Sequence, residues 1–240
     1  MECARLNRYG LLAVTGPEAR DFLHAQLTND IANLPADRAA LAGWCTAKGR
    51  LLASFLVIPS PAGFLLQLAR DIAPAVAKRL SMFILRSKVK IADESDAWAQ
   101  YGVWNGEGNA VAWSGDIVSV PVEPGRLLRI GRGLSLNATR SEDAWTLDEI
   151  RAGRPLISAA TQDKFVPQML NLEKLGAVDF KKGCYPGQEI VARAQHLGEV
   201  KRRLTRVQVP QGVELKPGQE FNGGVVVDSA AGEALAVMPL

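Results

Sequence analysis

The residue with the clearest chemical context in this sequence is Cys184, which lies in the run FKKGCYPGQEIVAR over residues 180–193. Gly183 permits a tight turn, and Pro186 suits the first turn of a helix that we expect over 186–197. The free amides and dipole at that helix start, together with Lys181 and Lys182, favour the thiolate form of the cysteine. The pattern therefore predicts a reactive, nucleophilic thiol.

A structural interpretation of Cys184 stays open beside the chemical one, because a lone cysteine is more often a small buried apolar residue. Cys3 and Cys45 have no comparable context and are expected in the core. His24 falls on the polar face of the first predicted helix, where we expect it to be solvated. Three cysteines at distant positions form neither a disulfide framework nor a CxxC pair, and no metal site is predicted.

The charge of the chain is small overall but unevenly distributed. The 240 residues carry 28 Lys and Arg against 25 Asp and Glu, a net charge of +3. Between Lys181 and Arg206, seven basic residues face two acidic ones, which gives +5 there and −2 in the remainder. This segment is either a solvated strand or loop or the binding surface for an anionic partner.

The spacing of apolar residues predicts a mixture of helices and strands. Strands are expected at 11–14, 51–58, 64–69, 88–91 and 177–181, with a five-residue loop at 59–63 closing a hairpin. Helices are expected at 17–27, at 72–84 after Asp71 as a cap, at 142–152 after Ser141 as a cap, and at 186–197. Short strands separated by turns are predicted over 98–130 and after 201. The fold class is therefore α+β.

The sequence also bears on where the protein resides. The N-terminus lacks the apolar core of a signal peptide, and the longest apolar stretch, 51–58, is too short to cross a bilayer. We therefore expect a cytoplasmic protein with free thiols and no membrane partner.

Five blocks of the sequence resemble one family. Lys182-Gly183-Cys184-Tyr185-x-Gly187-Gln188-Glu189 resembles the signature of the YgfZ-type folate-binding proteins, which are related to the aminomethyltransferase (T-protein) of the glycine cleavage system. Residues 22–30, 80–89, 151–155 and 165–172 resemble further blocks of the same family. The resemblance covers nearly the whole chain.

The resemblance implies a fold of small α+β subdomains around a central channel, with a C-terminal β-barrel. The corresponding division is a folate-binding core over 1–30 and 96–196, a second α+β subdomain over 31–95, and a small β-barrel-like domain over 197–240.

The resemblance also implies a function. A protein of this family binds tetrahydrofolate or a derivative and supports the assembly or repair of iron–sulfur clusters, and thereby tRNA modification. Its partners are folate and iron–sulfur enzymes or assembly proteins, direct contact with tRNA is not expected, and a monomer is expected. Cys184 is the candidate catalytic residue. The candidate binding residues are Lys182, Tyr185, Gln188, Glu189, Arg193, Arg151, Asn29 and Arg86.

Two departures from the T-protein pattern bear on whether the chain is an enzyme. T-proteins carry paired aspartates after a Gly-rich turn, whereas residues 49–55 contain no carboxylate, and Arg151 stands where a pterin-binding Glu precedes an Ala-Gly pair. General-base activation of a folate nitrogen then lacks its obvious agent, unless Asp148 or Glu149 substitutes. A folate-dependent aminomethyltransferase and an RNA-binding module that uses residues 181–206 stay open as alternatives.

Overall fold

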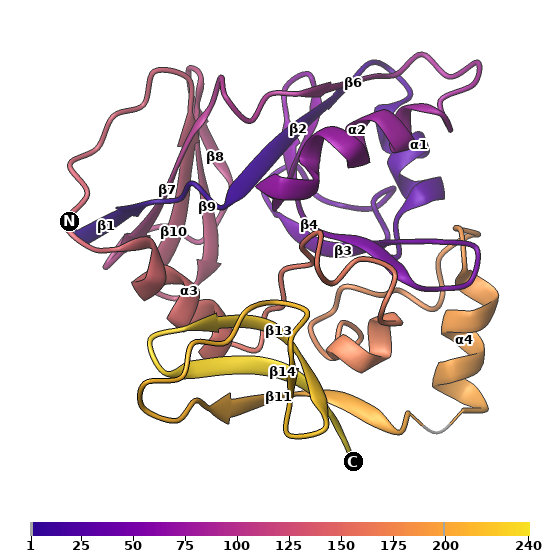
Figure 1. Cartoon of the computed structure of the whole chain (residues 1–240). Helices are drawn as coiled ribbons and strands as arrows, with labels where there is room; N and C mark the ends of the chain where they lie inside the picture. Colours follow the sequence, from indigo (N-terminus) through magenta and orange to yellow (C-terminus); the bar gives the residue numbers. More distant parts are fainter. Residues whose placement is uncertain (1, 199) are drawn as a thin grey trace. The chain divides into compact units, whose positions relative to one another are not determined.

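The computed structural model describes residues 2–198 and 200–240, so Met1 and Glu199 lie outside the described part of the chain. The chain forms two compact units. The first unit contains Met1–Leu23, Ile31–Ala40 and Phe55–Trp145, and the second contains His24–Asp30, Leu41–Ser54 and Thr146–Leu240. Both units combine helices with antiparallel strands, which confirms the α+β class (Figure 1). The sequence-based division into three subdomains stays a prediction.

The first unit contains a five-stranded antiparallel sheet with the order β1-β7-β10-β9-β8. Strands β7 (Ala99–Trp104), β8 (Ala112–Ser114), β9 (Ile117–Glu123) and β10 (Arg126–Gly131) confirm the short strands predicted over 98–130. The fifth strand, β1 (Glu2–Arg5), was not predicted. The Trp145 ring packs so closely on β7 that a Cβ on Gly102 would lie 2.1 Å from it. The absence of a side chain at Gly102 is therefore what lets this indole cover the sheet.

The first unit also contains strands β2 (Tyr9–Thr15), β5 (Gly63–Ala69) and β6 (Lys90–Asp93), together with most of β4 (Leu51–Ser60) and of α1 (Ala19–Gln26). These strands are ordered β4-β5-β2-β6. The predicted hairpin is confirmed, but its five-residue loop is wrong, because Pro59 pairs with Phe64 and Ser60 with Gly63. Gly63 has φ +141° and lies against β2, where a Cβ would meet the Val14 carbonyl oxygen at 2.3 Å.

Helix α2 (Ala73–Ser81) follows a single 3-10 turn, η1 (Arg70–Ile72). The prediction that Asp71 caps this helix is wrong: Ile72 holds the cap position without a side-chain cap bond. The helix also ends earlier than its apolar period predicts, so Met82 and Leu85 are 65% and 89% exposed. No described helix has the length and apolarity needed to cross a membrane.

The second unit begins with β3 (Ala40–Cys45), which is hydrogen-bonded to β4. It continues with the end of α3 (Glu142–Arg151), the 3-10 turn η2 (Pro167–Leu170) and helix α4 (Gln188–His196). The cap predicted for α3 is confirmed, since the Ser141 hydroxyl accepts the Ala144 amide at 3.3 Å.

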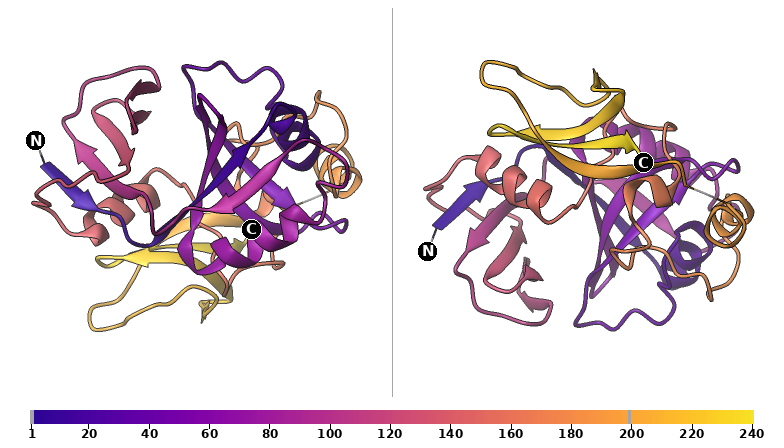
Figure 2. Two further views of the ribbon diagram at one scale, coloured as in Figure 1. Left: turned by 90° about the horizontal axis from the view of Figure 1, so that it is seen from above. Right: turned by 90° about the horizontal axis from the view of Figure 1, so that it is seen from below.

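The last forty residues form an antiparallel sheet of four strands in the order β11-β14-β13-β12. These strands are β11 (Arg202–Gln208), β12 (Glu220–Phe221), β13 (Gly224–Ala230) and β14 (Glu233–Pro239), and the three longer ones lie side by side in both Figures 1 and 2. The predicted C-terminal barrel is not confirmed. Among the described strands, β11 and β12 are the two edges, and the sheet is open.

The strand predicted over 177–181 is wrong. This segment turns instead, because the Asp179 carboxylate accepts the amides of Lys181 and Lys182 at 2.6 and 3.1 Å. A side chain that binds the backbone two residues on competes with the strand ladder for the same amides. The turn leads directly into the Cys184 segment.

Candidate functional site around Cys184

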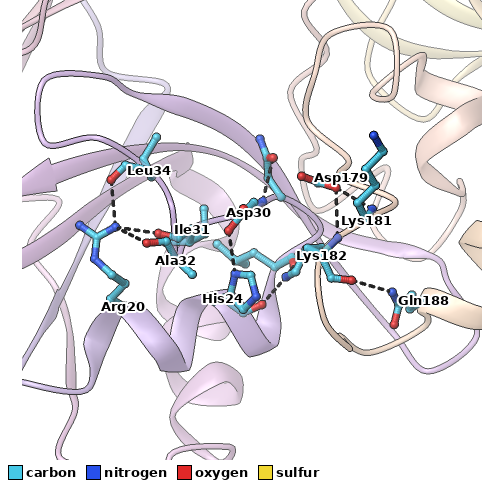
Figure 3. A network of polar contacts seen from close by, with 12 residues as sticks. Arg20, His24, Asp30, Ile31, Ala32, Leu34, Asp179, Lys181, Lys182 and Gln188 are labelled. Atoms are coloured by element: carbon cyan, nitrogen blue, oxygen red, sulfur yellow. Dashed lines mark hydrogen bonds and ion pairs between the residues drawn. The ribbon is translucent and has the colours of Figure 1, made fainter.

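Cys184 lies on a loop of the second unit that is fixed at both ends. The Asp179 turn holds the start, and at the other end the Gln188 amide donates to the Tyr185 carbonyl at 3.2 Å. The Gln188 side chain donates to the Lys182 carbonyl at 3.5 Å and closes the loop (Figure 3). Cys184 is exposed, whereas Cys3 and Cys45 are buried, as predicted for these two. The loop thus presents one thiol to solvent from a supported backbone.

The buried side chain of Lys182, only 8% exposed, supports the backbone of the Cys184 loop. Its Nζ donates to the carbonyl oxygen of His24 (Figure 3). It also donates to the carbonyl oxygen of Leu27 at 2.6 Å. Carbonyls at a helix C-terminus lack intrahelical donors, and a lysine is well suited to satisfy them. Lys182 also lies over the Tyr185 ring, with Nζ 5.1 Å from its centroid. The Cys184 loop is thereby tied to the end of α1.

The surroundings of Lys182 change its proton affinity. Burial lowers the pKa of Lys182 to about 8, and the Asp30 and Asp179 carboxylates and the Cys184 thiol limit that fall. A neutral amine retains two N–H donors, which match the two carbonyls that it serves. Lys182 therefore keeps its hydrogen bonds to the His24 and Leu27 carbonyls in both protonation states.

His24 is not simply solvated, as the sequence suggested, but forms part of this site. Its Nδ1 lies 3.2 Å from Asp30 Oδ1, and both side chains are 24% exposed. A Cβ on Gly183 would lie 3.8 Å from His24 Nε2, so the imidazole edge faces the residue before Cys184. The carboxylate orients the ring toward the loop. Sequence reasoning missed the pair because His24 and Asp30 are brought together only by the turn that follows α1.

Two glycines allow the start of α4 to pack against the turn that joins β3 to β4. Gly187, the N-cap residue, has φ +80°, and a Cβ there would meet the Thr46 carbonyl oxygen at 2.4 Å. Gly49 has φ +70°, and its Cβ would lie 2.9 Å from Ile190. The helix begins at Gln188, so Pro186 precedes it instead of lying in its first turn as predicted.

Tyr185 points into the interior and is 7% exposed. Burial is the main cause that raises the pKa of its phenol, and the nearby Cys45 and Asp179 groups act in the same direction. Burial also raises the pKa of the Cys45 thiol to about 12. Both groups are therefore neutral near pH 7, and Tyr185 acts as an aromatic support beneath the Lys182 ammonium.

The block around Thr28 and Asn29 joins the backbone segments that surround the loop. Asn29 Nδ2 donates to the Leu41 and Gly176 carbonyls at 2.7 and 2.8 Å, and its Oδ1 accepts the Asp30 amide. Thr28 Oγ1 donates to the Ala177 carbonyl at 2.6 Å and accepts the Gly43 amide at 2.7 Å. Asn29, predicted to bind substrate, thus has its polar atoms engaged by the protein backbone.

The basic residues of the site differ in their availability. Arg151 binds Glu233 of β14 through two contacts of 2.9 and 2.8 Å, and Arg203 binds Glu173 at 2.6 Å. Together with the buried Lys182, these guanidinium groups stabilise the fold. Among residues 181–206, the exposed charged side chains include Lys181, Glu189, Arg193, Lys201 and Arg202. Arg86 lies in the first unit, beside Glu18 and Ser87.

No metal centre is evident at this site. Within residues 2–198 and 200–240, no three side chains of His, Cys, Asp or Glu gather so as to hold a metal ion. The residues that the structure brings together around the loop are Cys184, Lys182, Tyr185, Gln188 and His24, of which His24 was not predicted.

Comparison with known proteins places this architecture in a class. No protein-family model matches the chain. The glycine cleavage system aminomethyltransferase T from Bartonella henselae superposes with a TM-score of 0.75 at 16% identity, over 99% of this chain and 78% of that one. The chain therefore has the aminomethyltransferase T fold.

The sequence comparison is more specific. The tRNA-modifying protein YgfZ of Serratia proteamaculans is 31% identical over 94% of this chain and 79% of its own length. The YgfZ of Pectobacterium carotovorum is 30% identical over 90% and 75%, and an uncharacterized Haemophilus influenzae protein is 33% identical over 90% and 76%. The chain belongs to the YgfZ family, which confirms the resemblance of its motifs.

The close packing of Gly187 predicts a selective loss of stability on substitution. We expect Gly187→Ala to lower the free energy of unfolding by about 2 kcal/mol or more, because the new Cβ both strains the left-handed backbone and strikes the Thr46–Gly49 turn. Gly212→Ala is the matched control, since Gly212 has the same φ of +80° but nothing within 4 Å. Urea denaturation measures both. Equal losses in the two variants would show that the contact is unimportant.

The buried Lys182 predicts a pH-dependent contribution to stability. Between about 8 and the ordinary value of 10.5, the unfolded chain holds the Lys182 proton and the folded chain does not, so the free energy of unfolding rises with pH in that window. Lys182→Met removes this rise and leaves two carbonyls without a donor. We expect it to cost about 1–3 kcal/mol at pH 10 and less at pH 7.

Denaturant unfolding of the wild type and of Lys182→Met at both pH values checks this. Lys181→Met is the control, because Lys181 is the exposed neighbour and its loss changes stability by less than about 0.5 kcal/mol. A difference between wild type and Lys182→Met that stays constant from pH 7 to pH 10 would contradict the linkage.

Proposed function

We propose that this protein binds tetrahydrofolate or a derivative and supports the assembly or repair of iron–sulfur clusters, indirectly serving tRNA modification, with Cys184 as a reactive thiol. Membership of the YgfZ family carries the proposal. The exposure of Cys184 on a loop that Lys182, Gln188 and Asp179 fix in place supports a role for this thiol beyond packing. The proposed setting is the cytoplasm, and the proposed form is a monomer.

The residues near Cys184 fit an anionic ligand in part. A folate tail ends in glutamyl carboxylates, which arginine and lysine bind by charge-assisted hydrogen bonds. Arg193 of α4 and Lys181 are exposed and suited to that role, whereas Lys182 and Arg151 have partners within the protein. We therefore assign tail binding to Lys181 and to Arg193 in the last turn of α4, while a role for Glu189 in its first turn stays a proposal from the family resemblance. Lys182, Tyr185, Asn29 and Gln188 position the loop. A role for Arg86 stays a proposal from the family resemblance.

The alternative function, aminomethyl transfer, has one of its two candidate bases engaged in an ion pair. Of Asp148 and Glu149, the two candidates to replace the missing aspartates, Glu149 binds Arg154 through two contacts of 2.8 Å. Ser54 lies in the stretch where T-proteins have acids, and its hydroxyl is engaged by the backbone of Pro155 and Ile157. Release of formaldehyde from a small amine in the presence of the protein and tetrahydrofolate would revive this alternative.

Folate binding is tested by calorimetry. We expect tetrahydrofolate to give a saturable heat with one site per chain, and Arg193→Ala to weaken binding by about tenfold through loss of a charge-assisted bond. Arg202→Ala, which removes an exposed arginine of β11, is the control and leaves the affinity unchanged. No saturable heat at millimolar ligand would exclude the folate part of the proposal.

The role of the thiol is tested in cells that lack the protein. We expect Cys184→Ala to fail to restore the activity of an iron–sulfur enzyme that modifies tRNA, while its free energy of unfolding changes by less than about 0.5 kcal/mol, since the side chain is exposed. Cys3→Ala removes a buried thiol of the first unit and serves as the control that retains function. Full rescue by Cys184→Ala would remove the thiol from the mechanism.

A further inference from the structure

The first unit carries a second basic segment that the net charge conceals. Residues 72–92 contain Lys78, Arg79, Arg86, Lys88 and Lys90 and no acidic residue, a local charge of +5. All five of these side chains are exposed. Acidic residues elsewhere in the chain balance this charge, so the segment over 181–206 falsely looks like the sole source of the positive excess. A segment of exposed basic side chains attracts polyanions.

Lys90 also lines a pocket of the first unit. The pocket has a volume of about 370 Å³, and its lining includes Trp98, Trp113, Glu94, Asp116 and Arg132. This volume lies at the lower end of the range of about 300–1,000 Å³ that small-ligand sites occupy. The pocket and the basic segment meet at Lys90, the first residue of β6.

The pocket lining includes two tryptophan rings that contact each other. The Trp98 and Trp113 rings meet edge to face, with centroids 6.2 Å apart, and Trp113 Nε1 donates to the Pro59 carbonyl at 3.0 Å. The Arg132 guanidinium lies 5.2 Å from the Trp98 ring centroid and pairs with Glu94 at 2.7 Å. These bonds hold the walls in place without filling the space between them.

The aromatic pocket and the basic residues beside it match the bases and the phosphates of a nucleotide chain. Indole and guanidinium planes stack on bases, and base–aromatic stacking is largely independent of sequence. The Asp116 carboxylate accepts hydrogen bonds, as the exocyclic amine of a base requires. The lysines along 86–90 suit the phosphates that follow such a base. A pterin shares the ring chemistry but not the repeated negative charge.

We propose that the first unit binds single-stranded RNA, with one base in the pocket beside Trp98 and Trp113 and the adjoining phosphates on Lys90 and Lys88. This binding goes beyond the proposed folate-dependent function. It also departs from the expectation of no direct RNA contact, which considered residues 181–206 alone.

The phosphate contacts are tested with a fluorescein-labelled single-stranded RNA of twelve nucleotides, by anisotropy over a range of salt concentrations. Lys88→Glu/Lys90→Glu is expected to weaken binding at least tenfold and to reduce the slope of log K against log salt by about 1.4, the value for two single-strand phosphates. Lys201→Glu/Arg202→Glu changes the net charge equally in the other basic segment and is expected to leave the affinity within threefold. Equal losses in the two double variants, or no binding at low salt, would overturn the proposal.

The base contact is tested with Trp113→Ala, which is expected to weaken RNA binding about tenfold, while Trp113→Phe retains a ring and stays within threefold of wild type. Circular dichroism confirms that each variant is folded. Inorganic polyphosphate, a polyanion without bases, is expected to bind wild type and Trp113→Ala equally. If RNA does the same, the pocket holds no base and the proposal fails.

Two further arms identify other occupants. Met82 and Leu85 are exposed within the same basic segment, so anionic phosphatidylglycerol vesicles are tested with the same charge variants. Vesicle binding that depends on Lys88 and Lys90, without RNA binding that does, would assign the segment to a membrane surface and overturn the proposal. Displacement of RNA by 5-formyltetrahydrofolate at an occupancy of one per chain would assign the pocket to folate and overturn it as well.

Discussion

The arrangement around Cys184 depends on the Lys182 amine, which lies under the loop and donates to the carbonyls of His24 and Leu27. A helix end leaves its last carbonyls without donors, and burying them unpaired costs free energy. By placing a lysine on those carbonyls, the fold satisfies the end of α1 and fixes the backbone two residues before the thiol in one step. The same burial lowers the pKa of Lys182, because the charged amine is less well solvated inside the protein.

A second constraint acts on the other side of the thiol. The start of α4 lies so close to the turn at Thr46–Gly49 that neither Gly187 nor Gly49 has room for a side chain. The helix is thus held by backbone contact, and the Gln188 side chain links it back to the Lys182 carbonyl. The loop that carries the exposed Cys184 is therefore held on both flanks.

Charge is used in two different ways in this protein. In the second unit, two basic residues of the 181–206 segment are bound within the protein: Arg203 by Glu173 and Lys182 by backbone carbonyls. Arg206 lies 3.6 Å from Glu233 but is half exposed. In the first unit, the five basic residues of 72–92 are all exposed. Counting charges along the sequence therefore includes side chains that the fold already pairs, and it overlooks the exposed charges of 72–92.

The sequence by itself determined the α+β class, the strand–helix order through residues 9–26, the cap at Ser141 and the family, because these depend on local periodicity and on contiguous motifs. It also singled out Cys184 as the thiol with a chemical context, whereas its exposure came from the structure. Only the tertiary structure showed that His24 faces the Cys184 loop, that Lys182 is buried, and that Asp179 turns the segment predicted as a strand. It also showed that the C-terminal sheet is open. Each of these rests on contacts between residues that lie far apart in the chain or on competition for a backbone amide, which single-sequence periodicity does not encode.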